Sequence, residues 1–231
     1  EIPEKNRFEF AAYYFNQAQK NGQEVMIVRK QNDMPLDFSI NDHEKSRESG
    51  ASERVWMTDD TISTGSWCYT SNLKIKPAAD VIHALIDTVS KNGVVLLNIS
   101  PLADGTIPED QRKVLLELGE WMEKYGESIY DTRPWVTFGE GPTKEPKGGF
   151  RDNQKFLHLK YSDRDIRYTA SKDGKTVYAI QMGIPEEPIT LKAVKLGQQG
   201  NVSLLGSEQP LSYKINEDGI VTIQSPDSAQ K

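Results

Sequence analysis

The sequence is poor in the features that mark several classes of protein. It has one cysteine, Cys68, so no disulfide can form within the chain, and no second thiol or nearby histidine completes a zinc site or a thiol nucleophile. We expect Cys68 to be a small buried hydrophobe. No apolar run approaches the ~20 residues of a membrane-spanning helix, so a membrane partner is not expected.

Positive charge is also sparse and is not concentrated anywhere. The chain has 28 basic and 34 acidic residues, a net charge of −6, and no stripe or tail of Lys and Arg, so nucleic acid is not expected as a partner. The three histidines, His43, His83 and His158, are too far apart in the sequence to predict a metal site. The opening segment EIPEKNRFEF has neither an initiator Met nor a signal-peptide pattern, as expected of a fragment.

Apolar residues make up only 36 % of the chain, but they are grouped into periodic segments that predict a folded protein. Helical spacing predicts helices over residues 7–20, 78–91 and 108–125. Strands are predicted over residues 24–30, 55–63 and 94–100, the first and last buried on both faces. This alternation is typical of an α/β fold with a parallel sheet. Three strands are too few for a closed barrel, so the first half resembles part of a larger one.

The pattern changes in the second half of the chain. Residues 136–150 are rich in Gly, Pro and Lys and are predicted to be a linker. About seven short strands are predicted beyond it, over residues 155–161, 165–182, 188–196, 201–206, 211–215 and 219–225. The segments SKDGK and NEDG are hairpin turn signals. We therefore divide the chain into an α/β domain, residues 1–140, and a small antiparallel β-sandwich domain, residues 141–231.

Three segments together carry a likeness to a known family. They are AAYYFNQAQKNGQEVMIVRK (11–30), WMTDDTISTGSWCYT (56–70) and KNGVVLLNISPLADGTIPEDQRKVLLELGEWMEKYGESIYDTRPW (91–135). In sequence, spacing and order they closely resemble the C-terminal part of the catalytic barrel of family 29 glycoside hydrolases, the retaining α-L-fucosidases. The likeness covers roughly residues 8–135.

The resemblance implies a partial (β/α)8 TIM-like barrel followed by a β-sandwich. It also implies an exo-acting enzyme that releases terminal L-fucose from a fucosylated oligosaccharide or glycoprotein glycan, through a covalent intermediate and without cofactor or metal. The family's nucleophilic Asp and sugar-binding histidines have no match here. We therefore expect the chain to lack an N-terminal half-barrel as its partner and to be inactive alone. An exported bacterial enzyme and a lysosomal one fit the family equally.

The charged loop DHEKSRESG, residues 42–50, follows the first predicted strand. A retaining glycosidase needs two carboxyl groups ~5–5.5 Å apart, and a TIM barrel carries them at the C-terminal ends of its strands. In the subgroup that the chain most resembles, D-[YI]-E-[RK]-G precedes the Trp of W-x-T-D by the spacing that separates Glu44 from Trp56. The resemblance thus implies Glu44 as the general acid/base. Glu48 and Glu53 are the alternatives, and from the loop alone a solvated carboxylate is the simpler interpretation.

Two further residues are candidates for sugar binding by resemblance. Arg29 matches an arginine that hydrogen-bonds the sugar, although an exposed arginine at a strand end is the alternative. Trp67 matches an aromatic residue that packs on the apolar face of fucose, although a core tryptophan is the alternative. We interpret Trp56 as a packing residue, Asp59 as one that orients its neighbours, and Asn98 as a hydrogen-bonding scaffold residue.

A different class of function is also compatible with the second half. The β-domain could be a carbohydrate-binding module, or it could only brace the barrel. Its aromatic residues are spread through the predicted strands and serve equally well as core. A sugar-binding test on residues 146–231 alone would distinguish a binding module from a structural one.

Overall fold

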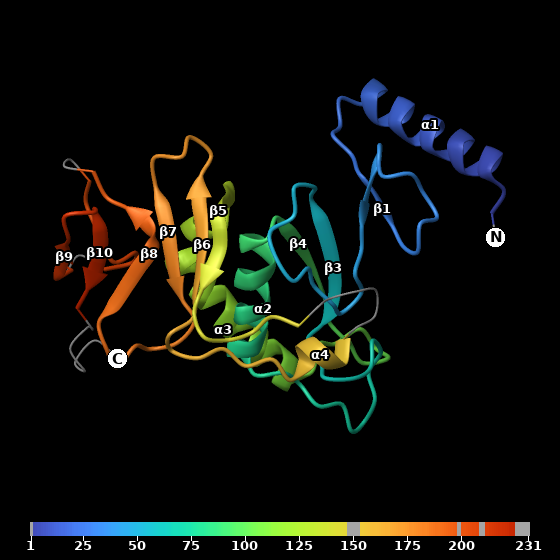
Figure 1. Cartoon of the computed structure of the whole chain (residues 1–231). Coiled ribbons are helices and arrows are strands. Elements are labelled where there is room, and N and C mark those ends of the chain that lie inside the picture. The colour runs from blue at the N-terminus through green and yellow to red at the C-terminus, as the bar shows by residue number, and fades with distance from the viewer. Residues whose placement is uncertain (1, 147–152, 198–199, 208–210, 225–231) are drawn as a thin grey trace.

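The structure, a computed structural model, describes residues 2–146, 153–197, 200–207 and 211–224. Its elements succeed one another along an elongated molecule (Figure 1). The N-terminal helix lies at one end, parallel strands with their helices lie in the middle, and antiparallel strands lie at the other end. Within the described ranges no helix is long and apolar enough to cross a membrane.

The first half contains helices and parallel strands in alternation. They are α1 (Glu4–Lys20), β1 (Ile27–Arg29), β2 (Ser39–Asn41), β3 (Trp56–Thr61), α2 (Ala78–Ser90), β4 (Gly93–Asn98) and α3 (Glu109–Tyr125). A short 3-10 turn, Gly126–Ser128, follows α3. The three predicted helices are confirmed. Proline precedes α2 and α3 directly, at Pro77 and Pro108, where its fixed φ suits the start of a helix.

The parallel strands follow one another in chain order. β1 pairs with β2, β3 pairs with β4, and a parallel bridge between Asp42 and Met57 connects the two pairs. Strand β2 lies in a segment where no strand was predicted, because its three residues are too few to show a period. α2 packs on β4, and its apolar residues form one core with α3. The members of that core are Ile62, Ala78, Val81 and Val114.

The outer parallel strands are less buried than their sequences predicted. Val28 of β1 is 40 % exposed, and Val94 and Leu96 of β4 are 50 % and 57 % exposed. The prediction that both strands are buried on both faces is therefore wrong for the described part of this chain. Helices cover one face of these strands, whereas alternate side chains point to the other face, which no element of the described residues covers.

The second half contains two antiparallel sheets of three strands each. The first has the order β5-β6-β7, with β5 (Thr132–Glu140), β6 (Ile166–Ser171) and β7 (Val177–Gln181). The second has the order β8-β10-β9, with β8 (Ile189–Lys195), β9 (Tyr213–Ile215) and β10 (Ile220–Ile223). Ile166, Tyr168, Leu191 and Val221 form a core that both sheets share. Helix α4 (Asn153–Leu157) lies between β5 and β6 in the chain.

Some local predictions for the second half are wrong and others are confirmed. Residues 136–140 are the end of β5 and not linker, since Gly139 and Glu140 pair with Arg167 and Ile166 of β6 after an irregularity in the strand. Residues 147–150 lie outside the described residues. A strand was predicted over residues 155–161, but residues 155–157 form the end of α4 and residues 158–161 form no strand. Residues 201–206, also predicted to be a strand, form none. Both hairpin turns are confirmed, since Gly174 and Gly219 lie within them with φ of 69° and 79°, where glycine is favoured.

Candidate functional site

The carboxyl ends of the parallel strands converge at one edge, and a compact group of charged side chains lies there. Lys30 follows β1, Asp42 and Glu44 follow β2, and Asp59 lies within β3. The Lys30 Nζ lies 3.0 Å from Asp42 Oδ2, 3.0 Å from Glu44 Oε2 and 3.0 Å from Asp59 Oδ2. We call these four residues the carboxylate cluster. Three carboxylates thus share one ammonium group.

Asp42 anchors the charged loop to the neighbouring strand. Its side chain is fully buried, and its Oδ1 accepts the backbone N–H of Glu44 and that of Asp59, each at 3.0 Å. The backbone N–H of Lys45 donates to the Asp59 carbonyl at 2.8 Å. Glu44 and Lys45 both have left-handed backbone conformations, with φ of 42° and 58°. Non-glycine residues keep such strained conformations only where surrounding contacts hold them.

The pKa values of three members of the carboxylate cluster are shifted by their surroundings. Burial raises the pKa of Asp59, and the adjacent Asp42 raises it further, against the effect of Lys30. Burial would also raise the pKa of Asp42, but the N–H groups of Glu44 and Asp59 and the Lys30 ammonium lower it below its usual value. Although burial opposes it, hydrogen bonds to the three carboxylates raise the pKa of Lys30. The cluster therefore keeps Lys30 and Asp42 charged and favours a proton on Asp59.

Arg29 points away from this cluster. Its Nε donates to Asn41 Oδ1 at 2.7 Å, and its side chain lies in a hollow with Phe8, Met34 and Phe38, against α1. Neighbouring residues of a strand point to opposite faces, so Lys30 rather than Arg29 reaches Glu44. The structure therefore does not bring Arg29 together with Glu44, and its role in sugar binding stays a prediction.

Trp67 lies beside the loop that carries Glu44. The Lys45 Nζ is 4.1 Å from the centre of the Trp67 ring. The Trp67 carbonyl accepts the Asn98 Nδ2–H at 2.9 Å and the Ser100 hydroxyl at 3.0 Å. The prediction that Asn98 is a hydrogen-bonding scaffold residue is confirmed. The Trp67 side chain is half-buried, which leaves part of its ring accessible, and its contact with sugar stays a prediction.

The alternative acids occupy different surroundings. Glu48 Oε1 lies 2.9 Å from His43 Nε2, and Glu53 is exposed. Trp56 is 2 % exposed and donates its indole N–H to the Lys91 carbonyl at 2.9 Å, which confirms it as a packing residue. Cys68 is exposed, so the prediction of a buried thiol is wrong, because the loop after β3 turns outward at this residue.

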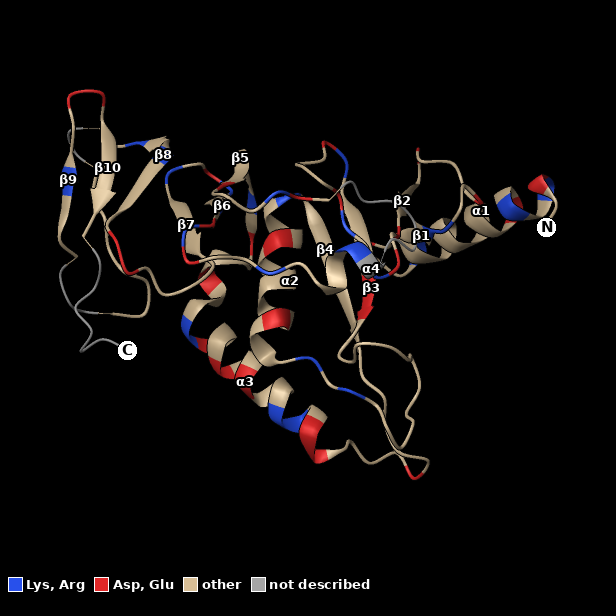
Figure 2. Cartoon of the chain, turned by 60° about the horizontal axis from the view of Figure 1, so that its bottom comes forward, with Lys and Arg blue, Asp and Glu red and all other residues tan. Residues whose placement is uncertain are grey.

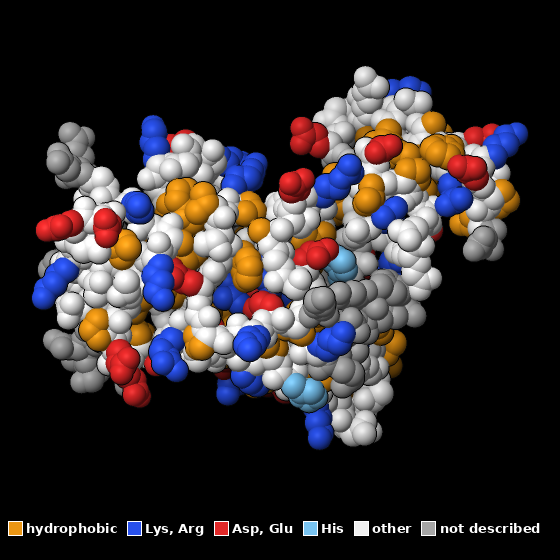
Figure 3. Space-filling model, viewed as in Figure 1, with side chains coloured by type: hydrophobic (Ala, Val, Ile, Leu, Met, Phe, Trp, Pro, Cys, Tyr) orange, Lys and Arg blue, Asp and Glu red, His pale blue; other side chains and the backbone are white. Residues whose placement is uncertain are grey.

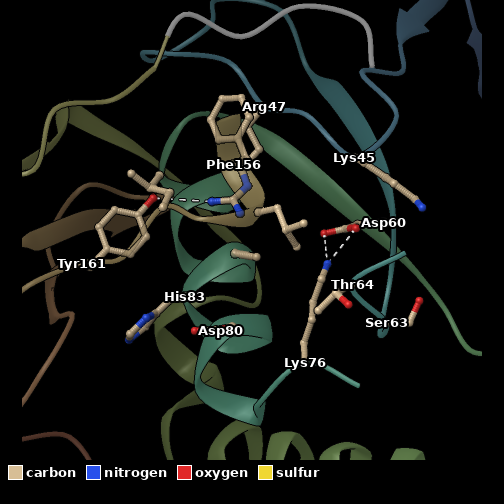
Figure 4. A pocket seen from close by; sticks show the side chains of 13 residues that line it. Lys45, Arg47, Asp60, Ser63, Thr64, Lys76, Asp80, His83, Phe156 and Tyr161 are labelled. Atoms are coloured by element: carbon tan, nitrogen blue, oxygen red, sulfur yellow. Dashed lines mark hydrogen bonds and ion pairs between the residues drawn. The ribbon is translucent and has the colours of Figure 1, made fainter. Parts of the chain in front are cut away.

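A second hollow lies on the opposite face of β3, against α2 (Figure 4). It is open to solvent, and its lining includes Lys76, Asp60, Arg47 and His83. The Lys76 Nζ lies 2.8 Å from Asp60 Oδ2, so these two charges pair within it. Burial lowers the pKa of His83, whose ring meets that of Tyr161 edge-on at 5.6 Å. Glu44 is not part of this lining, so the hollow is separate from the carboxylate cluster.

Two members of the cluster were not predicted as site residues from the sequence. Lys30 was overlooked because Arg29 beside it matched the family pattern, and Asp42 was overlooked because it stands in a loop full of charges. The alternation of side chains along a strand could have identified Lys30 as the cation facing Glu44. Across the described ranges no three His, Cys, Asp or Glu side chains are grouped so as to hold a metal ion.

Comparison with protein families identifies the chain. The family model described as Alpha-L-fucosidase matches residues 3–127, more than half of the chain. The chain belongs to the alpha-L-fucosidase family. The model described as Alpha-L-fucosidase C-terminal domain matches residues 161–231. Since α-L-fucosidases are glycoside hydrolases, the resemblance seen in the sequence is confirmed.

Similar proteins agree with this family. The plasma alpha-L-fucosidase of Homo sapiens is 30 % identical over 178 residues, which are 74 % of this chain and 33 % of that protein. The tissue alpha-L-fucosidase of Rattus norvegicus is 25 % identical over 90 % of this chain and 42 % of its own length. The Thermotoga maritima alpha-fucosidase, solved in complex with fucose, superposes with a TM-score of 0.72 at 26 % identity.

The chain spans only part of these relatives. The match to the Thermotoga maritima structure covers 97 % of this chain but only 46 % of the solved chain. This chain covers 42 % of the rat tissue enzyme and 33 % of the human plasma enzyme. More than half of each of these proteins lies outside the match.

Proposed function

We propose that this chain is the C-terminal part of a retaining exo-α-L-fucosidase and that Glu44 is its general acid/base. The observation that carries the proposal is the carboxylate cluster at the carboxyl edge of the parallel strands, in a chain of the alpha-L-fucosidase family. Of the three carboxylates, Asp42 is fully buried and Asp59 lies within β3, whereas Glu44 lies on the loop after β2 with its side chain 13 % exposed. The substrate would be terminal L-fucose on an oligosaccharide or glycoprotein glycan.

The proposed reaction has two steps. Glu44 protonates the oxygen of the leaving group while a nucleophilic Asp from an upstream segment attacks the anomeric carbon. Glu44 then removes a proton from the water that cleaves the glycosyl-enzyme. Lys30 holds the Glu44 carboxyl group at the carboxyl edge of the parallel strands, where a TIM barrel carries its catalytic groups.

The other sugar contacts follow from the same arrangement. Trp67 would pack against the apolar face of fucose, since its ring lies next to the residue after Glu44. Arg29 would contact substrate only if the loop after β1 rearranged, because its guanidinium group now binds Asn41. Of the two sugar-binding predictions, the contacts favour Trp67.

We also propose that the parallel strands are part of a TIM-like barrel which an N-terminal half-barrel completes. Strands in chain order with a helix crossover are the pattern of such a barrel. The uncovered apolar side chains of β1 and β4 would then face its interior. The antiparallel sheets would form a separate domain of the β-sandwich type, with β5 as its first strand. The chain alone should have no fucosidase activity.

The test is hydrolysis of an aryl α-L-fucoside by the full-length protein that contains this chain. We expect Glu44→Ala to be slow, most of all on substrates with poor leaving groups, and azide to restore the rate on a good one, because azide replaces the deprotonated water. Glu53→Ala tests an alternative acid on the same segment. Glu109→Ala is the control, since the Glu109 side chain is 81 % exposed at the start of α3.

Each result decides between specific alternatives. Full activity of Glu44→Ala would exclude Glu44 as the acid/base and direct attention to Glu48 and Glu53. Absence of fucoside cleavage by the wild-type full-length protein would overturn the proposed function and leave only family membership and fold.

A further inference from the structure

A network of buried charges connects the two halves of the chain. Asp87, in the last turn of α2, has no exposed side-chain surface. Its Oδ1 accepts from Arg167 Nε at 2.8 Å, and its Oδ2 lies 2.9 Å from Lys91 Nζ and 3.3 Å from Arg47 Nη1. Glu145 completes the network through Lys91, at 3.1 Å, and through Arg167. We call these five residues the interdomain ion network.

Asp87 brings together three segments that are distant in the sequence. Arg47 belongs to the loop that carries Glu44, and Arg167 belongs to β6 of the antiparallel part. The Arg167 guanidinium group also lies over the rings of Phe138, at 5.3 Å, and Tyr161, at 4.8 Å. A buried, stacked and paired arginine has a fixed position. The second half of the chain therefore reaches the Glu44 loop through the Asp87 carboxylate. It also contacts the loop directly, since Arg47 Nη1 lies 3.5 Å from the Tyr161 hydroxyl and the Arg47 guanidinium group lies 5.2 Å from the centre of the Phe156 ring.

The position of Asp87 is not explained by the stability of its own helix. A carboxylate in the last turn of a helix is unfavourable, because the C-terminal end of the helix carries partial negative charge. Burial adds a further penalty. The three cations offset both effects, and they lower the pKa of Asp87 to about 2 although burial alone would raise it. Asp87 is thus placed for its contacts with Arg47, Lys91 and Arg167.

The loop needs such an anchor at this point. Glu44 and Lys45 are in the left-handed region, which costs roughly 1–3 kcal/mol for each non-glycine residue. Asp42 holds the loop before them. Directly after them Ser46 is fully buried, and Arg47 is 9 % exposed and bound to Asp87. The strained pair is therefore held from both sides.

We propose that Arg47, Asp87 and Arg167 are positioning residues through which the antiparallel domain holds the Glu44 loop in its strained, productive conformation. The catalytic consequence rests on the proposed function, whereas the anchoring itself does not. The β-domain would then contribute to the site without touching substrate.

Hydrogen exchange of the backbone amides tests the anchoring on this chain without any substrate. In Arg167→Met we expect the amides of residues 43–46 to exchange about tenfold faster than in the wild type, because their anchor is lost. Arg133→Met is the matched control: Arg133 is on β5 of the same sheet but is exposed, and its loss should leave these amides unchanged. Unchanged exchange at residues 43–46 in folded Arg167→Met would overturn the proposal.

Two further variants keep the test decisive. Arg47→Met removes the contact from the loop side and should accelerate the same amides, whether or not Arg167→Met folds. Arg167→Lys keeps the charge but has a single donor group, so it should give a smaller acceleration than Arg167→Met. In the full-length protein, Arg167→Met should lower kcat about tenfold with little change in KM, and Arg167→Lys should recover part of that loss. A change in KM alone would contradict a positioning role.

Discussion

Lys30 is the residue on which the charge of the candidate site depends. It is 40 % exposed, so solvent screens its ion pairs, and we expect Lys30→Met to lower the free energy of unfolding at pH 7 by about 1 kcal/mol. The loss should be smaller at pH 4, because Asp59, whose pKa is raised, takes up a proton first and no longer repels Asp42. Urea unfolding at both pH values measures the difference. Lys113→Met, on the exposed face of α3, is the control.

If Lys30→Met lowered the free energy of unfolding equally at both pH values, the effect would come from packing of the lysine side chain and not from its charge. A loss that grows towards pH 4 would contradict the proposed balance of charges.

Gly93 lies opposite Trp56 across the β3–β4 pair, and nothing larger fits there. A Cβ at this position would lie 2.6 Å from the Trp56 ring and 2.6 Å from the Thr88 methyl group, both of which are buried. We expect Gly93→Ala to lower the free energy of unfolding by about 2 kcal/mol through overpacking. Gly119→Ala, inside α3 with open space around it, should raise it by up to about 1 kcal/mol. Thermal unfolding of both variants measures these changes. A change in stability of the same sign in both variants would contradict the prediction.

At the scale of elements, α2 connects the parallel and antiparallel parts. It packs against β4 and α3 on one side and against β5 and β6 on the other. Figure 2 shows acidic residues along α2 and α3, and Asp87 is the one at the C-terminal end of α2 that the interdomain ion network buries. The stability of this junction is therefore expected to depend on pH.

The Asp87 carboxyl has a lower pKa in the folded chain, about 2, than its ordinary value of 3.8. A lowered carboxyl pKa contributes stability above 3.8, and that contribution is lost as the pH falls towards 2. Asp87→Asn should lower the free energy of unfolding by about 3–5 kcal/mol at pH 7, since it leaves buried cations without their carboxylate partner. Between pH 4 and pH 2 its deficit relative to wild type should narrow by about 2 kcal/mol. Chemical unfolding of both proteins over this pH range measures the difference in stability. A difference that does not change with pH would show that the Asp87 carboxylate does not contribute stability through its charge.

Among the elements, those with long periodic patterns were predictable from the sequence. α2 and α3 were expected within a residue or two of their bounds, since apolar residues repeat along them and a proline precedes each. Strand β2 and the end of β5 were not predictable. The first is too short to show alternation, and the second contains residues typical of a linker, which only the partner strand β6 holds in a sheet.

At the scale of the whole molecule, apolar surface is unusually accessible. Figure 3 shows hydrophobic side chains gathered around α1, and Phe10 and Tyr13 are 54 % and 66 % exposed. Val28, Val94 and Leu96 add a second uncovered surface on the parallel strands. Exposed apolar surface of this kind marks a site of association. The proposed N-terminal half-barrel would cover this surface.

We therefore expect this chain alone to self-associate and to be poorly soluble. The weight-average mass in sedimentation should rise with protein concentration, and Val94→Thr with Leu96→Thr should reduce that rise because both side chains lie on the uncovered face of β4. Val136→Thr is the control, since Val136 is 81 % exposed but lies on β5. A monomer at all concentrations would show that the uncovered face is not a site of association.

The sequence by itself determined the family and the order of elements, because both depend on residues that are close together in the chain. It also singled out Glu44 by its spacing from Trp56. Only the tertiary structure decided which charges meet. Lys30 rather than Arg29 faces Glu44, since the alternation of β1 is fixed by its pairing with β2. Asp87 meets Arg47 and Arg167, 40 and 80 residues away, only because the two halves of the chain pack together.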